Sequence, residues 1–251
     1  IDPAKTLPQN HPTVTVSEHI EKTFGSKFVV VIGITPKEGD AFQPIVLEKV
    51  RRMTDGLRDT PGVVKGNLLS LAARRAKSIH GTPEGMEVHP LMEAVPQTEA
   101  GREALRRAIQ DNPVYQNAIV SQDGRTAAII AEFLDDPNGF RGIMEKVHAV
   151  GDRERDDRVD IAIGGLPAAL AQIEIYSERM GILFPLALFI IAAIHYEAFR
   201  TIQGLLLPLV TGLLAVIWGL GVMGLAGVPM DTFNATTPIL ILAVAAGHAV
   251  Q

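Results

Sequence analysis

Two polar side chains interrupt an apolar run near the end of the chain. His248 and Gln251 lie three residues apart in the segment AAGHAVQ at 245–251, so in a helix they share one side. An imidazole titrates near neutral pH, and an ionisable group in an apolar helix normally faces a protein interior or a water path. We therefore expect His248, supported by Gln251, to face the interior of a helix bundle and to couple protons. The alternative is that His248 only makes a hydrogen bond to a neighbouring helix.

A second polar group separates two apolar runs. His195, Glu197 and Arg200 follow the first run and precede the second. Side chains at the end of a membrane helix can reach the interface with their polar tips. We interpret these three residues as interface candidates that mark a membrane boundary.

The elements that carry these residues are recognised by a nearly complete loss of charge. After Arg179 only Glu197, Arg200 and Asp231 are charged, whereas residues 1–179 hold 22 of the 23 basic and 26 of the 28 acidic side chains. The uncharged runs at 180–196 and 204–225 approach or reach the roughly 20 apolar residues that cross a bilayer. The sequence predicts a multi-pass membrane protein whose direct partner is the lipid bilayer.

A third apolar run begins near residue 237 and continues to residue 250. We expect transmembrane helices at about 168–197, 204–225 and 237–251, the last one truncated. No leader with a basic start and a short apolar core is visible at residue 1. We therefore expect the sequence to be an N-terminal fragment of a longer protein, with a first transmembrane helix upstream.

Composition and motifs exclude several kinds of function. The chain has no cysteine, so thiolate metal sites and disulfides are ruled out. The charges of residues 1–179, 22 basic minus 26 acidic or −4, are interspersed, which disfavours nucleic acid as a partner. No phosphate-binding loop, nucleophile elbow or HExxH helix occurs, and His11, His19, His80, His89 and His148 have no ligand spacing. We expect neither an enzyme nor a bound cofactor or metal.

The front of the chain repeats a strand–helix–strand pattern. The β-branched run at 28–35 is followed by apolar residues in helical spacing and a second apolar run at 63–71. A hairpin at 118–134, a helix that opens at 136 and a strand at 159–163 follow. Two tandem βαβ units predict a ferredoxin-like α+β domain, with two helices on one face of a four-stranded sheet.

The remaining segments set the domain boundaries. Residues 72–113 are an insertion, which we expect to be loop apart from one short helix near 99–110. Residues 168–180 contain no proline or glycine, which favours one helix that runs from the domain into the membrane. We expect a soluble domain at 1–167 and a transmembrane region at 168–251.

The order of these parts resembles a known transporter superfamily. The matching segments are LPQNHP at 7–12, GLP at 165–167, FRTIQG at 199–204, LPL at 207–209, IWGLGVMG at 217–224 and GVPM at 227–230. In order and spacing, they resemble the resistance-nodulation-cell division (RND) superfamily of exporters, in the branch of MMPL-type and hydrophobe/amphiphile efflux proteins. The resemblance covers essentially the whole sequence. It implies a periplasmic porter domain joined to an α-helical transmembrane bundle in a bacterial inner membrane.

The resemblance also bears on the site. Relatives commonly carry a proton-relaying acid on the fourth transmembrane helix, and here Gly247 stands at the position of that acid and His248 at that of the following tyrosine. The acid is missing, and His248 is the residue that could replace it.

Two functions agree with this resemblance. The first is a proton-driven exporter of hydrophobic or amphiphilic molecules, lipids among them, that works as a homo-oligomer or with a partner membrane protein. We expect apolar linings to set its specificity. The alternative is a non-transporting accessory or regulator of the same architecture, similar to SecD/SecF or to sterol-sensing proteins.

Overall fold

The computed structural model describes residues 11–24, 28–83, 85–228, 234 and 236–249. The chain divides into two compact units, Ile20–Ala171 and Gln172–Gln251 with Ile1–His19. The first is a mixed α/β unit, and the second consists mainly of long apolar helices. Helix α2, Pro12–Phe24, precedes the first strand.

The mixed unit is built on a three-stranded antiparallel sheet. Strand β1, Phe28–Pro36, lies between β4, Ala127–Phe133, and β5, Val159–Gly165. Val30, Ile32 and Ile34 of β1 are fully buried, whereas Val29 and Val31 are more than a third exposed. The two-residue alternation of a strand therefore gives the sheet one covered and one open face.

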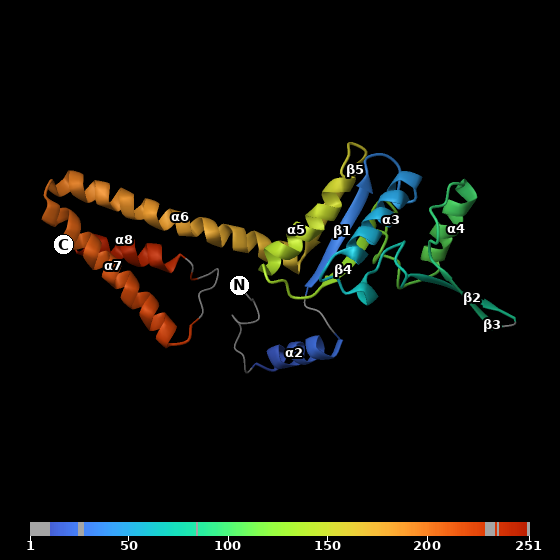
Figure 1. The fold of residues 1–251 in the computed structure, drawn as a ribbon, viewed down its shortest axis with the longest axis horizontal. Coiled ribbons are helices and arrows are strands. Elements are labelled where there is room, and N and C mark those ends of the chain that lie inside the picture. Colours follow the sequence, from blue (N-terminus) through green and yellow to red (C-terminus); the bar gives the residue numbers. More distant parts are fainter. Residues whose placement is uncertain (1–10, 25–27, 84, 229–233, 235, 250–251) are drawn as a thin grey trace. The chain divides into compact units, whose positions relative to one another are not determined.

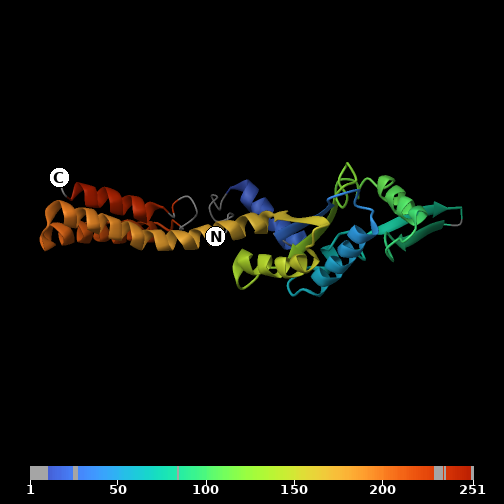
Figure 2. The ribbon, with the colours of Figure 1, turned by 90° about the horizontal axis from the view of Figure 1, so that it is seen from above.

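Two amphipathic helices cover the buried face (Figure 1; Figure 2). Helix α3, Pro44–Asp59, buries Val46, Val50, Met53 and Leu57, and α5, Gly139–Gly151, buries Phe140, Ile143, Met144 and Val147. A Cβ added to Gly56 of α3 would lie 3.1 Å from Val150 of α5, so the absence of a side chain lets the two helices approach closely. The predicted order of strand and helix is confirmed for β1–α3, and the predicted strand–helix–strand order is confirmed for β4–α5–β5.

The predicted fourth strand at 63–71 is wrong as a continuous strand. Residues 62–69 follow the free edge of β4 through bridges of Val63 to Phe133 and of Leu69 to Ile130. Between them Lys65–Asn67 forms a 3₁₀ turn, η1, because Lys-Gly-Asn is a turn sequence rather than a strand sequence. A second short 3₁₀ turn, η2, spans Asp152–Glu154.

The insertion contains more structure than its sequence predicts. Helix α4, Glu99–Gln110, has the predicted bounds and is capped by Thr98, whose hydroxyl accepts from the N–H of Gly101. Strands β2, Lys77–Thr82, and β3, Gly85–Pro90, form a separate antiparallel hairpin. The prediction of a loop was wrong there.

Three helices make up most of the second unit. Helix α6 runs from Leu166 to Phe199, α7 from Ile202 to Leu225 and α8 from Thr237 to His248. Gly165 ends β5 at φ 114°, where an added Cβ would lie 2.3 Å from the Val29 carbonyl oxygen, so α6 can begin directly after the strand only at a glycine. Ile182–Phe199 and Ile202–Leu225 are long and apolar enough to cross a bilayer, as predicted.

Candidate functional site

Helices α7 and α8 pack through small side chains. The buried residues of α7 are Pro208, Gly212 and Val216, four residues apart, and those of α8 are Leu242 and Ala246. A Cβ on Gly212 would lie 3.0 Å from Leu242 Cδ1, and one on Gly219 would lie 2.8 Å from Ile241 Cδ1. Glycines on one stripe let helix backbones approach closely in lipid, where van der Waals packing replaces the hydrophobic effect.

The proton-coupling candidate His248 is the last residue of α8. It follows the buried Ala246 by two residues, or about 200° around the helix, and its side chain is exposed. Helix α7 therefore does not supply the bundle interior that His248 was expected to face. Gln251 lies outside the described residues, so the role of the pair stays a prediction.

The interface candidates lie at the junction of α6 and α7. His195 Nδ1 lies 2.8 Å from the Ile191 carbonyl oxygen, one turn earlier in α6. Arg200 pairs with Glu197 at 2.5 Å, and both side chains are about three-quarters exposed. Thr201 then caps α7 by accepting from the N–H of Gly204 at 3.1 Å. A tight polar turn thus joins the two apolar helices, and its position at the interface stays a prediction.

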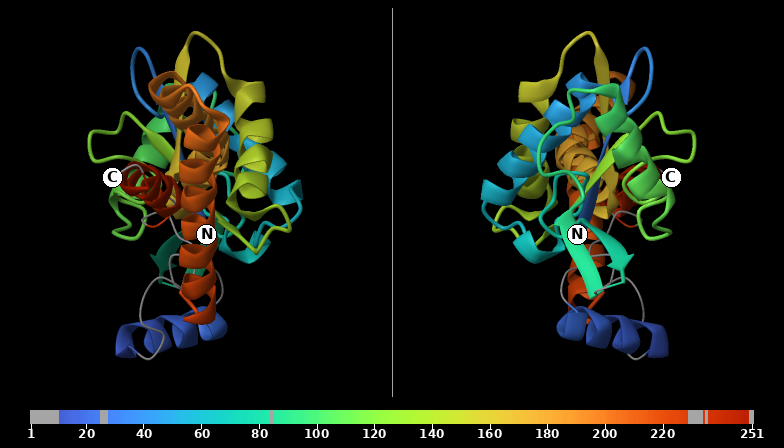
Figure 3. Two further views of the ribbon diagram at one scale, coloured as in Figure 1. Left: turned by 90° about the vertical axis from the view of Figure 1, so that its left-hand side faces the viewer. Right: turned by 90° about the vertical axis from the view of Figure 1, so that its right-hand side faces the viewer.

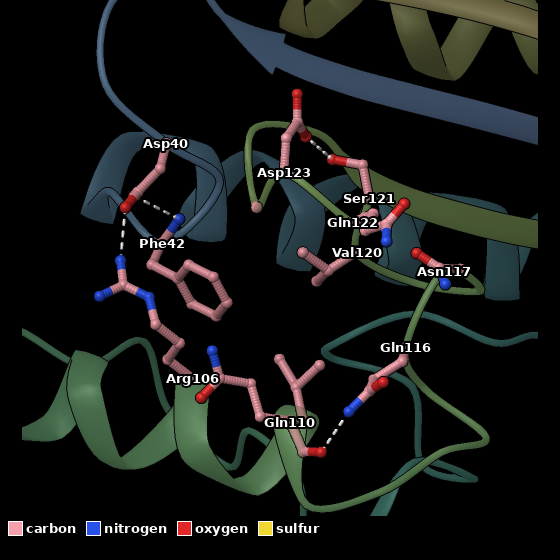
Figure 4. Close-up of a pocket in the computed structure, with 12 residues that line it drawn as sticks. Asp40, Phe42, Arg106, Gln110, Gln116, Asn117, Val120, Ser121, Gln122 and Asp123 are labelled. Carbon is pink, nitrogen blue, oxygen red and sulfur yellow. Dashed lines mark hydrogen bonds and ion pairs between the residues drawn. The ribbon is translucent and has the colours of Figure 1, made fainter.

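The mixed unit contains a pocket of about 560 Å³ between α4 and two loops. The guanidinium of Arg106, on α4, forms ion pairs with Asp40 and Glu103 and stacks 4.7 Å from the ring centre of Phe42. Figure 4 shows Asp40 and Phe42 beside Arg106, opposite the loop that carries Ser121 and Asp123. Two carboxylates already neutralise this cation, so the pocket is not a basic anion site.

Amide and hydroxyl groups dominate the rest of the lining, which includes Gln110, Gln116, Asn117, Ser121 and Gln122. Asn117 has φ 61°, a left-handed conformation that asparagine tolerates better than most residues. The Ser121 hydroxyl donates to Asp123 at 2.5 Å and the Arg125 N–H donates at 3.0 Å; these bonds lower the pKa of Asp123. The lining of this pocket is mainly polar, and the apolar lining expected for a substrate path stays a prediction.

Sequence reasoning missed the pocket, because its walls come from residues about 80 positions apart. The Asp123–Gly124 turn was the one local signal in the sequence. Among the described residues, no group of three or more His, Asp or Glu side chains could hold a metal ion. The arrangement is suited to hydrogen bonding with a polar group.

Two apolar helices of membrane-spanning length follow a mixed α/β unit in this chain, and this arrangement agrees with the membrane protein that the comparisons indicate. A family model described as MMPL family matches residues 29–250, which include both the sheet and the apolar helices. The chain belongs to the MMPL family, and the resemblance stated from its motifs is confirmed.

A similar protein supports the membrane assignment. The chain is 22% identical over 252 residues to "Putative membrane protein MJ1562" of the archaeon Methanocaldococcus jannaschii, an alignment that covers 95% of this chain and 60% of that protein. The chain thus spans about 60% of the length of the curated relative that it matches.

Proposed function

We propose that this chain forms part of a proton-driven antiporter that exports hydrophobic or amphiphilic molecules, lipids among them, across the cell membrane. The observation that carries the proposal is the MMPL match, which extends without interruption from the α/β unit through the apolar helices. Transport needs an energy source, and no nucleotide-binding motif occurs in the sequence. We also propose that the chain has no enzymatic activity of its own.

In this proposal the mixed unit is a porter domain on the outer side of the membrane, the periplasmic side in a bacterium. The strand order β5–β1–β4, extended beyond β4 by residues 62–69, supports a ferredoxin-like arrangement. Arg200 in the α6–α7 turn supports a cytoplasmic turn, since positive residues favour that side.

The polar pocket is suited to the head group of an amphiphile. Gln110, Gln116 and Gln122 each offer an amide that can both donate and accept, whereas the charge of Arg106 is already paired with Asp40 and Glu103. A neutral, hydroxyl-bearing head group would satisfy these amides without displacing an ion pair. The apolar tail of the same molecule would remain in contact with lipid or with apolar surface.

Transport is tested with the full-length protein in sealed vesicles that contain a fluorescent amphiphile. We expect the amphiphile to leave the vesicles when a pH gradient is imposed. We expect this export to stop when an ionophore collapses the gradient. Export that continues after collapse contradicts proton coupling. An absence of export under both conditions contradicts the transport proposal itself.

The role of His248 is tested in the same vesicles. We expect His248→Ala to abolish most gradient-dependent export at matched expression, and His248→Asp, which restores an ionisable group, to retain part of it. His195→Ala is the control, because His195 contacts the carbonyl oxygen of Ile191 in its own helix. Full export by the His248→Ala variant would show that His248 only packs and does not couple protons.

A non-transporting accessory or regulator is the second candidate. The feature that favours it is the lack of a family-type acid: from residue 202 to residue 251 the sequence has Asp231 as its one acidic residue, and Asp231 lies before α8. If the full-length protein moves no amphiphile but pulls down a membrane partner that stimulates another transporter, the accessory role replaces the exporter.

A further inference from the structure

The β2–β3 hairpin carries an apolar face that lies open. Its register pairs Ile79 with Val88 and Gly81 with Met86, so these side chains share one face. Ile79, Met86 and Val88 are 55%, 69% and 49% exposed. The hairpin extends beyond α4 (Figure 1; Figure 3), and an isolated two-stranded hairpin is at best marginally stable in water. We therefore expect another protein surface to bury this apolar face.

The backbone of β3 is oriented to accept another strand. The N–H of Leu91 donates to the Ala76 carbonyl at 2.9 Å, and this pair continues the register of the hairpin. Because bonded and non-bonded pairs alternate in an antiparallel ladder, Glu87 and His89 direct their backbone groups toward β2. Met86 and Val88 direct theirs outward, at the edge of a sheet that has two strands in the described part of the chain.

The opposite edge is partly occupied within the chain. The N–H of Lys77, on β2, donates to the Tyr115 hydroxyl at 2.7 Å, and that hydroxyl lies 3.0 Å from the Lys77 carbonyl, to which it donates. A tyrosine thus caps the outer edge of β2 at its base. Edge strands are templates for pairing with other chains, and in the described residues β3 is the edge of the hairpin without such a cap.

We propose that β3 pairs antiparallel with β3 of a second copy of this chain, with Val88 at the twofold axis. Each Val88 then exchanges two hydrogen bonds with its counterpart. The Met86 N–H donates to the Pro90 carbonyl of the other copy, a pairing in which the missing N–H of proline is tolerated at the end of the strand. The two hairpins form one four-stranded sheet whose apolar face is shared.

Charge complementarity selects a second copy as the partner and fixes this register. With Val88 on the axis, Glu87 lies opposite His89 of the other copy, and the twofold repeats this pair. A register centred on His89 would place Glu87 opposite Leu91 of the other copy and lose both glutamate–histidine pairs, and one centred on Glu87 would place two glutamates side by side. Like charges directly opposite destabilise a strand pair. Within one copy His89 Nε2 lies 3.7 Å from Glu87 Oε2, so pairing joins four complementary groups.

The contact is small, because each copy contributes a single strand edge and three apolar side chains. Small interfaces bind weakly in dilute solution, but two chains held in one membrane have a high effective concentration. We therefore expect the pairing in membranes and its loss on dilution in detergent. The proposal goes beyond the transport function and does not depend on which molecule is moved.

Cysteine cross-linking tests the proposal directly, because residues 1–251 contain no cysteine, and any cysteine elsewhere in the full-length protein is first replaced by serine. In the full-length protein in native membranes, oxidation should link Val88→Cys to its own copy. Residues that form a hydrogen-bonded pair lie about 5.5 Å apart between Cα atoms, within disulfide range. The control is Ile79→Cys, which lies opposite Val88 on β2 and is similarly exposed at 55%. In the dimer its two copies are three strand spacings apart, and we expect several-fold less cross-linking.

Charge reversal tests the register. In the Val88→Cys background, Glu87→Lys places a lysine opposite His89 of the other copy and should reduce cross-linking. The double change Glu87→Lys with His89→Glu restores opposite charges and should recover it. Three results would each overturn the proposal. They are equal cross-linking of Val88→Cys and Ile79→Cys, cross-linking of Val88→Cys to a different protein, and a charge reversal without effect.

Discussion

The two compact units differ in where they place their apolar side chains. In Ile20–Ala171, residues such as Ile32, Leu57 and Val147 are fully buried. In the unit that holds α7 and α8, Phe189, Trp218 and Leu225 are 70%, 72% and 91% exposed. Such an apolar surface would favour aggregation in water, but it is the surface expected of a helix in lipid. This difference is the one expected between a unit that faces water and a unit that faces lipid.

The units also differ in how they use charge. In the mixed unit the nearly buried Lys49 donates to the Glu154 carbonyl at 2.5 Å and lies 3.1 Å from Asp156. Hydrogen bonds from the Arg158 backbone and guanidinium, reinforced by Lys49, hold the pKa of Asp156 well below its usual range. In the helical unit the Glu197–Arg200 pair is exposed at a helix end. Charge thus ties segments together in one unit, whereas in the other it lies exposed in the turn between two apolar helices.

The largest expected effect is in the core of the mixed unit. Ile32→Ala removes a fully buried side chain from the central strand and should lower the free energy of unfolding by about 2–5 kcal/mol. Val31→Ala is the matched control, since Val31 lies on the open face of the same strand at 38% exposure. Thermal unfolding of the purified protein measures both. Equal losses would show that the open face is packed as tightly as the covered one.

The next effect is in the helical unit. Gly212→Val introduces a side chain whose Cβ would lie 3.0 Å from Leu242, and overpacking of this kind costs about 1–3 kcal/mol. We expect a lower melting temperature in detergent. The control Gly221→Val changes the same helix where no heavy atom lies within 4 Å of an added Cβ. If the two variants have the same melting temperature, the glycine stripe does not hold α7 against α8.

A smaller effect is expected from a nearly buried ion pair. Asp136 is 5% exposed and accepts from Lys146 at 2.6 Å and from the Asn138 N–H at 2.9 Å; these bonds lower its pKa. The stabilisation of the folded state by the Asp136 carboxylate is therefore complete above the ordinary aspartate pKa of about 3.9. It is lost as the pH falls through the lower pKa that Asp136 has in the folded protein.

Asp136→Asn should cost about 1–2 kcal/mol near neutral pH, a modest figure because Lys146 is 34% exposed and solvent screens the pair. It should also remove part of the acid-induced loss of stability. Unfolding curves recorded from pH 7 to pH 3 check both effects. Asp135→Asn is the control, because Asp135 is an exposed neighbour, and a parallel change in that variant would refute the assignment to Asp136.

The smallest effect is expected at the α6–α7 turn. Glu197→Gln breaks an ion pair whose partners are 74% and 75% exposed, and exposed pairs contribute about 0–1 kcal/mol. Its melting temperature should match that of the unchanged protein. A large loss would mean that Glu197 is buried against another part of the membrane assembly and is more than a boundary residue.

Periodicity predicted the elements that bury a regular stripe. Strand β1, helices α3 and α5, and α4 with its bounds follow from apolar spacing and capping alone. The apolar run at 63–71 was misread because Lys65–Asn67 turns the chain between two bridges to β4. The β2–β3 hairpin was missed because its apolar residues alternate over six-residue strands among glycines and prolines, which are typical of loops.

The sites were predictable to different degrees. The loss of charge after Arg179 predicts that His248 lies in an apolar helix. It also predicts the junction between two helices that holds His195, Glu197 and Arg200. The polar pocket does not, because Asp40 and Arg106 meet only after the chain has folded around α4. The direction in which a side chain on α8 points is also set by tertiary packing, here by the contact of Leu242 and Ala246 with α7.

The central claim is that movement of an amphiphile is exchanged for movement of protons. The most direct measurement imposes an amphiphile gradient, without a pH gradient, on vesicles that contain the full-length protein and a trapped pH indicator. We predict that the amphiphile drives protons in the opposite direction, and that His248→Ala reduces this flux together with export. Amphiphile movement without any change in internal pH would contradict the account.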